Sequence, residues 1–183
     1  MTVNMTKKME CISASLIMAQ LLYSENHLGN VFYSITFAIR ASIAFKLHHD
    51  HPYHQQWFLS PIKNDLDREI RRRLFWNSYI IDQLYATSTG VIPNNINVND
   101  VYTKLPCHSN IYKNSNFYSK IKENEENFRS FDFFTNHSLS DSFTLLIKSC
   151  ILLGKVNSWK MKYVYETEEA NLQSPTMLPE FRV

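Results

Sequence analysis

The chain has 183 residues, of which 44% are hydrophobic and 14% aromatic, so it carries enough apolar material for the core of one domain. This composition excludes a chain that is disordered throughout. The formal net charge of +2 is too small to indicate nucleic-acid binding by itself, because such binding usually needs a concentrated basic face. Cys11, Cys107 and Cys150 are odd in number and far apart, so they imply neither a disulfide framework nor a zinc site and favour a reducing compartment.

The first two predicted elements are helices joined by a short connection. A stripe of apolar residues predicts a helix over residues 9–24, and we expect Gly29 to end it. A second stripe predicts a helix over residues 31–47. The two stripes consist of Ile12, Leu16, Ala19 and Tyr23, and of Ile35, Ile39, Ile43 and Leu47. The short connection favours an antiparallel hairpin.

A third helix is predicted after a histidine-rich, proline-containing loop, HHDHPYHQQWFLSPIKND. We expect it to begin near Asp65 or Asp67 and to end before Gly90. An extended polar loop rich in Asn follows and is closed by Pro106. Residues 107–130 are rich in Asn, Ser and Lys, which predicts a solvated connection.

A last long helix is predicted over residues 140–163, with Ser140 as its N-cap. Residues 166–183 are predicted to be a tail or truncated edge, which leaves residues 1–165 as the domain. No strand pattern of convincing length and no internal repeat occurs. The predicted fold class is therefore all-α, with antiparallel helices around a central buried helix at residues 67–88.

Two apolar stretches fit neither a signal peptide nor a membrane span. Ser13, Ser15 and Gln20 interrupt the first stretch, and no small-residue cleavage site follows it. The second, FTLLIKSCILLGKVNSW, contains Lys148 and Lys155 and is too short to cross a bilayer. We therefore predict a soluble protein with no membrane partner.

The third helix is predicted to be apolar nearly all round, which is typical of a buried helix. At about 100° per residue, one stripe holds Ile70, Leu74, Ile81 and Leu84, and the opposite side holds Phe75, Tyr79 and Ala86. Asp82 lies near the Phe75 side, so we expect it to be at least partly buried and to need a partner. The candidate partners are Arg40 and backbone N–H groups in the loop after Gly90.

Three consecutive arginines, residues 71–73, stand near the start of this helix. They suit phosphate contact or nuclear localisation, or else structural ion pairs with Asp65, Asp67 and Glu69. We favour ion pairs, because these acids offset the basic charge and the arginines lead directly into the buried part of the helix.

An arginine pair, an aromatic–Trp pair, a Tyr and an Asp follow one another along this helix, and a loop glycine and a Leu-Pro segment come after them. The residues concerned are Arg72, Arg73, Phe75, Trp76, Tyr79, Asp82, Gly90, Ile96, Asp100, Leu105 and Pro106. In order and spacing they resemble the fungal-specific transcription factor domain, the middle homology region of fungal binuclear zinc-cluster regulators. AIRASIAFKLHHD upstream and ILLGKVNSW downstream resemble further helices of that family, so the resemblance covers residues 10–160.

The chain departs from the family pattern in the loop after the helix. Val91 stands where the family has an arginine, the loop proline comes late as Pro93, and Gln83 replaces the arginine that often follows Asp82. Where an Arg–Asp network ties this loop to the helix in the family, we expect that network to be weaker here.

The resemblance implies an all-α regulatory domain that acts in the nucleus in the regulation of DNA-templated transcription and is not an enzyme. The family's DNA-binding part is a six-cysteine cluster holding two zinc ions, and these 183 residues contain no such cluster. We therefore expect this chain to be a fragment, with DNA binding and zinc only in a longer protein, and no cofactor or metal in the chain itself. The implied partners are transcriptional co-regulators or a small-molecule effector; the oligomeric state stays open.

Two alternatives remain open beside this interpretation. His48, His49, His51 and His54 with Asp50 form a dense group that suits zinc or copper, which would make the chain a helical metal-binding protein or enzyme. The chain could also be a non-functional truncated product. We predict no catalytic residues, because no Gly-rich phosphate loop, nucleophile elbow or paired carboxylates stand out.

Overall fold

The computed structural model describes residues 3–50, 59–90, 94–109, 112, 134 and 141–173. Over these residues the chain forms four α-helices and one short 3-10 helix, without a β-strand, which confirms the predicted all-α class. The elements are α1 (Val3–Ser24), α2 (Leu28–Ala44), α3 (Asp65–Thr89), η1 (Val98–Asp100) and α6 (Ser142–Gln173). None of these helices is both long and apolar enough to cross a membrane.

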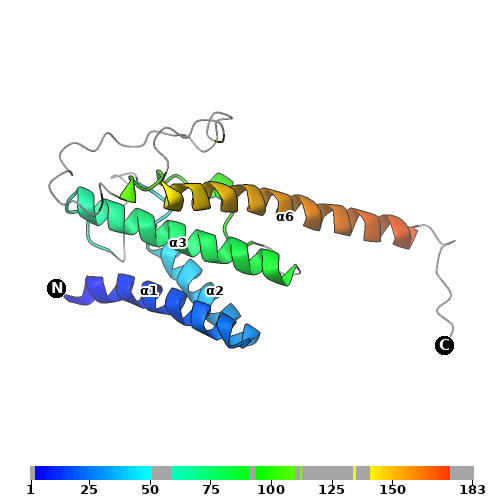
Figure 1. The fold of residues 1–183 in the computed structure, drawn as a ribbon, viewed down its shortest axis with the longest axis horizontal. Helices are drawn as coiled ribbons and strands as arrows, with labels where there is room; N and C mark the ends of the chain where they lie inside the picture. Colours follow the sequence, from blue (N-terminus) through cyan, green and yellow to red (C-terminus); the bar gives the residue numbers. More distant parts are fainter. Residues whose placement is uncertain are drawn as a thin grey trace.

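Helix α3 occupies the centre of the fold. The α1–α2 pair lies along one side of it and α6 along the other (Figure 1), and α3 contacts all three of these helices. Its start and end follow local rules: the Asn64 side chain accepts from the Asp67 N–H at 2.8 Å, and Gly90 ends the helix at φ 67°. The predicted central helix is therefore confirmed.

Helices α1 and α2 form the expected antiparallel hairpin (Figure 1), but Gly29 does not end α1. The chain turns at Asn26, whose φ is 62°, a conformation that Asn adopts more readily than most residues. Gly29 lies inside the first turn of α2, with no atom within 4 Å of the position of a Cβ, so neither space nor backbone requires glycine there. Helix α2 also ends earlier than predicted, at Ala44, and Lys46 follows with φ 54°.

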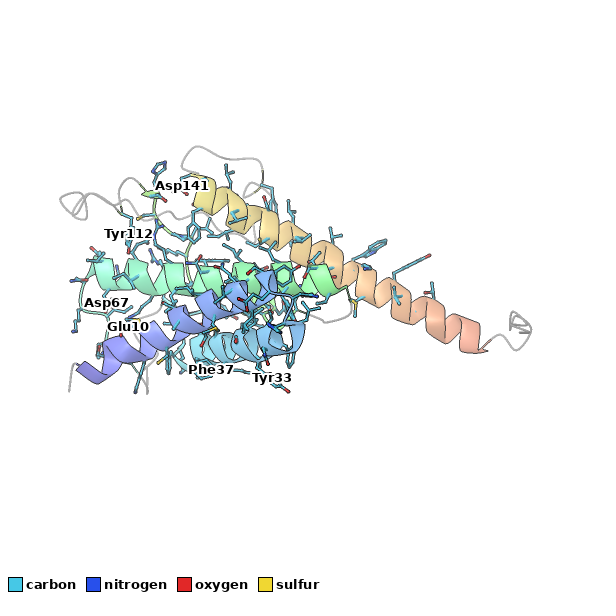
Figure 2. The ribbon with its side chains drawn as sticks, turned by 60° about the horizontal axis from the view of Figure 1, so that its bottom comes forward. Glu10, Tyr33, Phe37, Asp67, Tyr112 and Asp141 are labelled. Carbon is cyan, nitrogen blue, oxygen red and sulfur yellow. The ribbon has the colours of Figure 1, made fainter. Side chains whose placement is uncertain are left out.

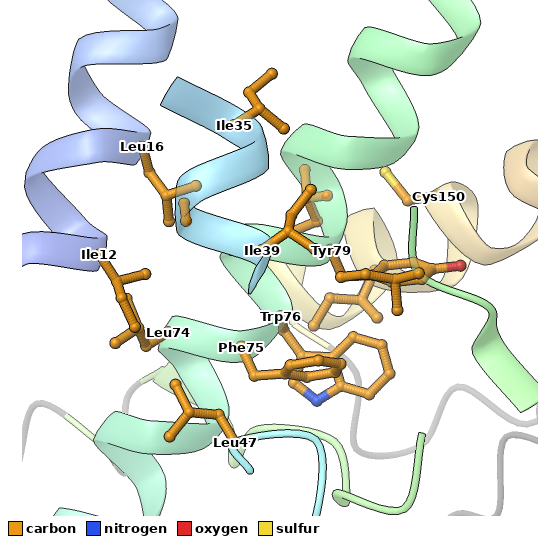
Figure 3. Close-up of a cluster of buried hydrophobic side chains, with 14 of the residues drawn as sticks. Ile12, Leu16, Ile35, Ile39, Leu47, Leu74, Phe75, Trp76, Tyr79 and Cys150 are labelled. Atoms are coloured by element: carbon orange, nitrogen blue, oxygen red, sulfur yellow. The ribbon is translucent and has the colours of Figure 1, made fainter. Parts of the chain in front are cut away.

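The core lies between α3 and its neighbours (Figure 3). Three aromatic residues of α3 form its centre, with the Phe75 and Trp76 rings at 5.4 Å and the Trp76 and Tyr79 rings at 5.5 Å, all edge to face. Apolar residues from the other helices surround them: Ile12, Leu16 and Ala19 of α1, Val31, Ile35, Ala38 and Ile39 of α2, and Ile147, Cys150 and Ile151 of α6.

The prediction that α3 is buried on all sides is wrong for one strip. The side with Phe75 and Tyr79 is fully buried, whereas Ile70 and Leu84 are 37% and 47% exposed. Helices packed on two sides of a third helix leave a strip between them that neither covers. Apolar side chains are also exposed on α2, where Tyr33 and Phe37 lie on its outer face (Figure 2).

Helix α6 differs from its prediction at both ends. Asp141 caps it, because its Oδ1 accepts from the Thr144 N–H at 3.0 Å, and its Oδ2 accepts from the Ser109 N–H at 2.7 Å. Ser140, the predicted cap, lies outside the described residues. The helix runs to Gln173 instead of Tyr163, and its C-terminal end extends past the other helices (Figure 1). The domain boundary after residue 165 stays a prediction.

The Asp141 cap predicts a pH-dependent contribution to stability. Burial would raise the pKa of Asp141, but the hydrogen bonds from Ser109 and Thr144 outweigh it and lower the pKa from 3.8 to about 2. The ionised carboxylate therefore stabilises the fold above pH 3.8, and this contribution is lost as the pH falls toward 2. Asp141→Ala should lower the free energy of unfolding by about 1 kcal/mol at neutral pH, and by progressively less below pH 4.

Urea unfolding of the wild-type protein and of Asp141→Ala across this pH range measures the difference in their free energies of unfolding. Glu10→Ala, on an exposed site of α1 (Figure 2), is the control and should show no such pH dependence. A difference for Asp141→Ala that stays constant down to pH 2 would contradict the cap.

Candidate functional site

Residues 71–73 each bind a different part of the chain, and Arg71 holds the segment before α3. Its Nη2 lies 2.9 Å from Asp67 Oδ2 and donates to the Ser60 carbonyl at 3.0 Å, while its Nε donates to Asp67 Oδ1 at 3.1 Å. Arg71 and Arg72 are both buried. Of the three predicted acidic partners, Asp67 and Glu69 are confirmed, whereas Asp65 pairs with Arg68 instead of with one of these three arginines.

Arg72 joins three segments through Asp50, which follows α2. Its Nε donates to Asp50 Oδ2 at 2.7 Å. The same carboxylate accepts from the Thr103 hydroxyl and from the Lys104 N–H, both at 2.9 Å. From the sequence, Asp50 stood only within the family motif and the histidine group. Three arginines in a buried helix need three acids, and that requirement could have indicated a partner outside the helix.

Arg73 anchors the chain after Pro106. Its Nε donates to Glu69 Oε1 at 2.8 Å, and its Nη2 donates to the Cys107 carbonyl at 2.7 Å. Glu69 Oε1 in turn accepts from the Cys107 N–H at 3.0 Å. The guanidinium also lies 4.3 Å from the centre of the Tyr112 ring and 5.3 Å from that of Phe143, so it links α3 to the start of α6.

Burial raises the pKa of Glu69, although the Cys107 N–H and the Arg73 charge act in the opposite direction. Burial and the neighbouring Glu69 carboxylate raise the pKa of the Cys107 thiol to about 11. The thiol is therefore protonated at neutral pH and is a poor nucleophile.

Residues 101–107, which we name the strap, run in an extended conformation against α3. The Trp76 Nε1–H donates to the Lys104 carbonyl at 2.9 Å, and the Tyr102 N–H donates to the His48 carbonyl at 2.8 Å. Val101, Thr103 and Leu105 are buried and alternate with more exposed residues, and Pro106 and Cys107 are buried as well. The loop is thus extended, as predicted. It packs against the core, because Arg73 and Trp76 donate hydrogen bonds to its backbone carbonyls.

Asp82 holds the beginning of the same connection. It is 1% exposed and accepts from the Asn95 N–H at 2.9 Å, the Asn95 Nδ2 at 2.8 Å and the Ile96 N–H at 3.0 Å. Of the two predicted partners of Asp82, the backbone N–H groups after Gly90 are confirmed. The prediction of Arg40 is wrong, since Arg40 is exposed. A loop can supply several N–H donors that converge on one carboxylate, so no buried guanidinium is needed.

The two titratable groups on this side of α3 both respond to burial. Burial raises the pKa of Asp82, and the hydrogen bonds from Asn95 and Ile96 act against it. Burial also raises the pKa of Tyr79, with smaller contributions from Cys150 and Asp82, so the phenol stays protonated. Both groups are buried, with Tyr79 and Asp82 each 1% exposed.

The model of the Fungal specific transcription factor domain matches residues 3–179. The chain belongs to this family. No curated protein and no solved structure matches it. In this fungal transcription factor domain, the predicted signature residues of α3 lie along its buried side or bind the connection that follows it. They are Arg72, Arg73, Trp76, Tyr79 and Asp82.

Gly90 and Pro106, the other two such residues, bound this connection. Gly90 N–H donates to the Ala86 carbonyl at 3.1 Å with φ 67°, a conformation that favours glycine. A Cβ there would meet Lys160 Nζ at an ordinary 3.6 Å, so the backbone rather than crowding selects glycine. Pro106 is buried in the strap. Val91 and Pro93, the departures from the family pattern, lie outside the described residues.

The histidine group of this domain is only partly described. The His48 and His49 rings lie 4.1 Å apart, and His49 stacks on Tyr102 at 4.9 Å. Asp50, the acidic residue of this group, forms an ion pair with Arg72. Among the residues that the structure describes, no three His, Cys, Asp or Glu side chains are grouped to hold a metal. His51 and His54 lie outside them, so the metal-binding alternative stays a prediction.

Removing the Asp82 carboxylate should destabilise the domain strongly. Asp82→Ala leaves the buried N–H groups of Asn95 and Ile96 without an acceptor, so we expect a loss of about 3 kcal/mol in the free energy of unfolding. Asp82→Asn keeps one acceptor oxygen and should lose about half as much. Urea unfolding measures both, with the exposed Asp100→Ala as control; equal effects of Asp82→Ala and Asp100→Ala would contradict the geometry.

The Arg72–Asp50 pair should contribute more than the exposed pair of the same helix. Arg72→Met leaves a largely buried carboxylate unpaired, which should cost about 3 kcal/mol. Arg68→Met breaks the solvent-exposed pair with Asp65 and should cost about 0.5 kcal/mol or less. Thermal or urea unfolding of the two variants measures the loss in the free energy of unfolding. A loss for Arg72→Met no larger than that for Arg68→Met would refute the stabilising role of the Arg72–Asp50 pair.

Proposed function

We propose that the chain is the regulatory domain of a fungal zinc-cluster transcription factor, that it acts in the nucleus, and that it is not an enzyme. The observation that supports this most is the family match over residues 3–179. DNA binding and zinc belong to a six-cysteine cluster of a longer protein, because the three cysteines here cannot form one.

The ion pairs formed by the three arginines also support a regulatory rather than a DNA-binding role. Arg71, Arg72 and Arg73 are each bound to an acid of the same chain, and formal charges nearly balance over the whole sequence, with 19 Lys and Arg against 17 Asp and Glu. A domain of this kind acts by changing conformation or partner when an effector or co-regulator binds. Such an effector or co-regulator would stabilise the packing of α3 against α6.

A reporter assay tests this role. The chain fused to a heterologous DNA-binding module, in a fungal host, should change reporter output relative to the module alone. Asp82→Ala in the fusion should reduce the change, because it destabilises the domain, whereas the exposed Asp100→Ala should preserve it. Reporter output equal to that of the module alone, for a fusion that is expressed and nuclear, would refute the proposal. In a gel shift at moderate salt, the purified chain should show no sequence-specific duplex binding.

A further inference from the structure

A half-enclosed cavity lies between α3, α6 and the connection around η1. Its volume is about 590 Å³, within the range of small-molecule sites. Apolar side chains such as Ile151 and Met161 form part of the wall, and amide side chains from all three segments form the rest. The sequence pattern drew attention to Tyr79 and Gln83 but not to a cavity, because the cavity exists only where the three segments meet.

Gln83 lies in the wall of this cavity, with its Oε1 against Gly154. It is 0% exposed, and its Nε2 lies 3.4 Å from Asp82 Oδ2, which fixes the orientation of the amide. Its Oε1 is therefore turned away from Asp82, and it has no hydrogen-bond donor among the described residues. A buried acceptor left unpaired is costly, so a donor supplied by a bound molecule would be favourable here.

The neighbouring amides are held in place around Gln83. Asn157 Nδ2 donates to Asn94 Oδ1 at 3.0 Å, and Asn94 Nδ2 lies 3.4 Å from the Gly154 carbonyl. A Cβ at Gly154 would collide with the Gln83 amide. Glycine at this position of α6 thus lets Gln83 reach the cavity wall, and the amides are arranged before any ligand arrives.

Lys155 gives the cavity its charge. Among the described lining residues it is the one ionised side chain, and the others are neutral amides, the hydroxyl groups of Tyr79 and Ser158, and apolar groups. Its Nζ lies 5.1 Å from the centre of the Phe134 ring, which leaves its N–H donors available to an anionic group. The cavity therefore combines one acceptor that lacks a donor, one cation and an apolar wall.

We propose that this cavity binds a small organic acid that bears hydroxyl groups. A ligand hydroxyl donates to Gln83 Oε1, the carboxylate lies by Lys155, and the carbon skeleton packs against Ile151 and Met161. The inference rests on the proposed regulatory function in that it names the effector class, and it places that effector where it bridges α3 and α6 and stabilises their packing.

Three six-carbon probes separate the required features. Gluconate has a carboxylate and hydroxyls, hexanoate has the carboxylate alone, and sorbitol has the hydroxyls alone. Ligand-observed NMR titration of the purified chain should show saturable binding of gluconate in the millimolar range, with hexanoate and sorbitol each weaker by about tenfold or more, since each lacks one of the two polar interactions. Absence of saturable gluconate binding, or equal binding of hexanoate, would overturn the proposal.

Two variants locate the binding. Gln83→Met removes the unpaired acceptor and should weaken gluconate binding about tenfold while the protein stays folded, because that oxygen has no donor to lose. Lys155→Met, at an exposed position of α6 that lines the cavity, should weaken it to a similar extent. Lys162→Met is the matched control on α6, 75% exposed and paired with Glu166, and should leave binding unchanged.

Unchanged gluconate binding in a folded Gln83→Met or Lys155→Met protein would refute this site. The reporter assay does not depend on gluconate, so loss of the reporter effect and loss of probe binding are distinguishable results. A reporter effect without gluconate binding would refute the ligand class alone, whereas gluconate binding without a reporter effect would refute the regulatory role alone.

Discussion

The ion pair between Arg72 and Asp50 is the interaction on which the rest of the structure depends. It lies where the segment after α2, the helix α3 and the strap meet, and the Asp50 carboxylate joins its own segment to the other two. Two charges taken out of water are stable only with good geometry and additional hydrogen bonds. Thr103 and Lys104 provide these bonds, so the position of the strap and the ion pair stabilise each other.

The same arrangement recurs along α3. Glu69 and Asp82, like Asp50, use carboxylate oxygens to accept backbone N–H groups of the connection that follows the helix. Irregular backbone has no partners of its own, and burying it requires acceptors from elsewhere. A central helix with buried acids thus makes a long connection part of the core, which explains why charged residues occur on a helix surrounded by aromatic side chains.

The contact between α3 and α6 is of another kind. It combines apolar side chains such as Ile147 and Ile151 with neutral amides, and beside the cavity it leaves Gln83 Oε1 without a donor from the described part of the chain. Buried polar groups that are incompletely satisfied mark places where a structure has a role other than stability. The part of the fold fixed by ion pairs and the part suited to a ligand therefore lie at different positions along the same helix.

The sequence by itself determined that α3 begins near Asp65 and ends before Gly90, and that it has an aromatic face. It also determined that the arginines pair with nearby acids such as Asp67 and Glu69, because helix geometry places residues four apart together. Only the tertiary structure decided that Arg72 binds Asp50, that Asp82 binds Asn95 and Ile96, and that one strip of α3 stays exposed. These outcomes depend on how segments far apart in the chain pack, and no local periodicity contains that information.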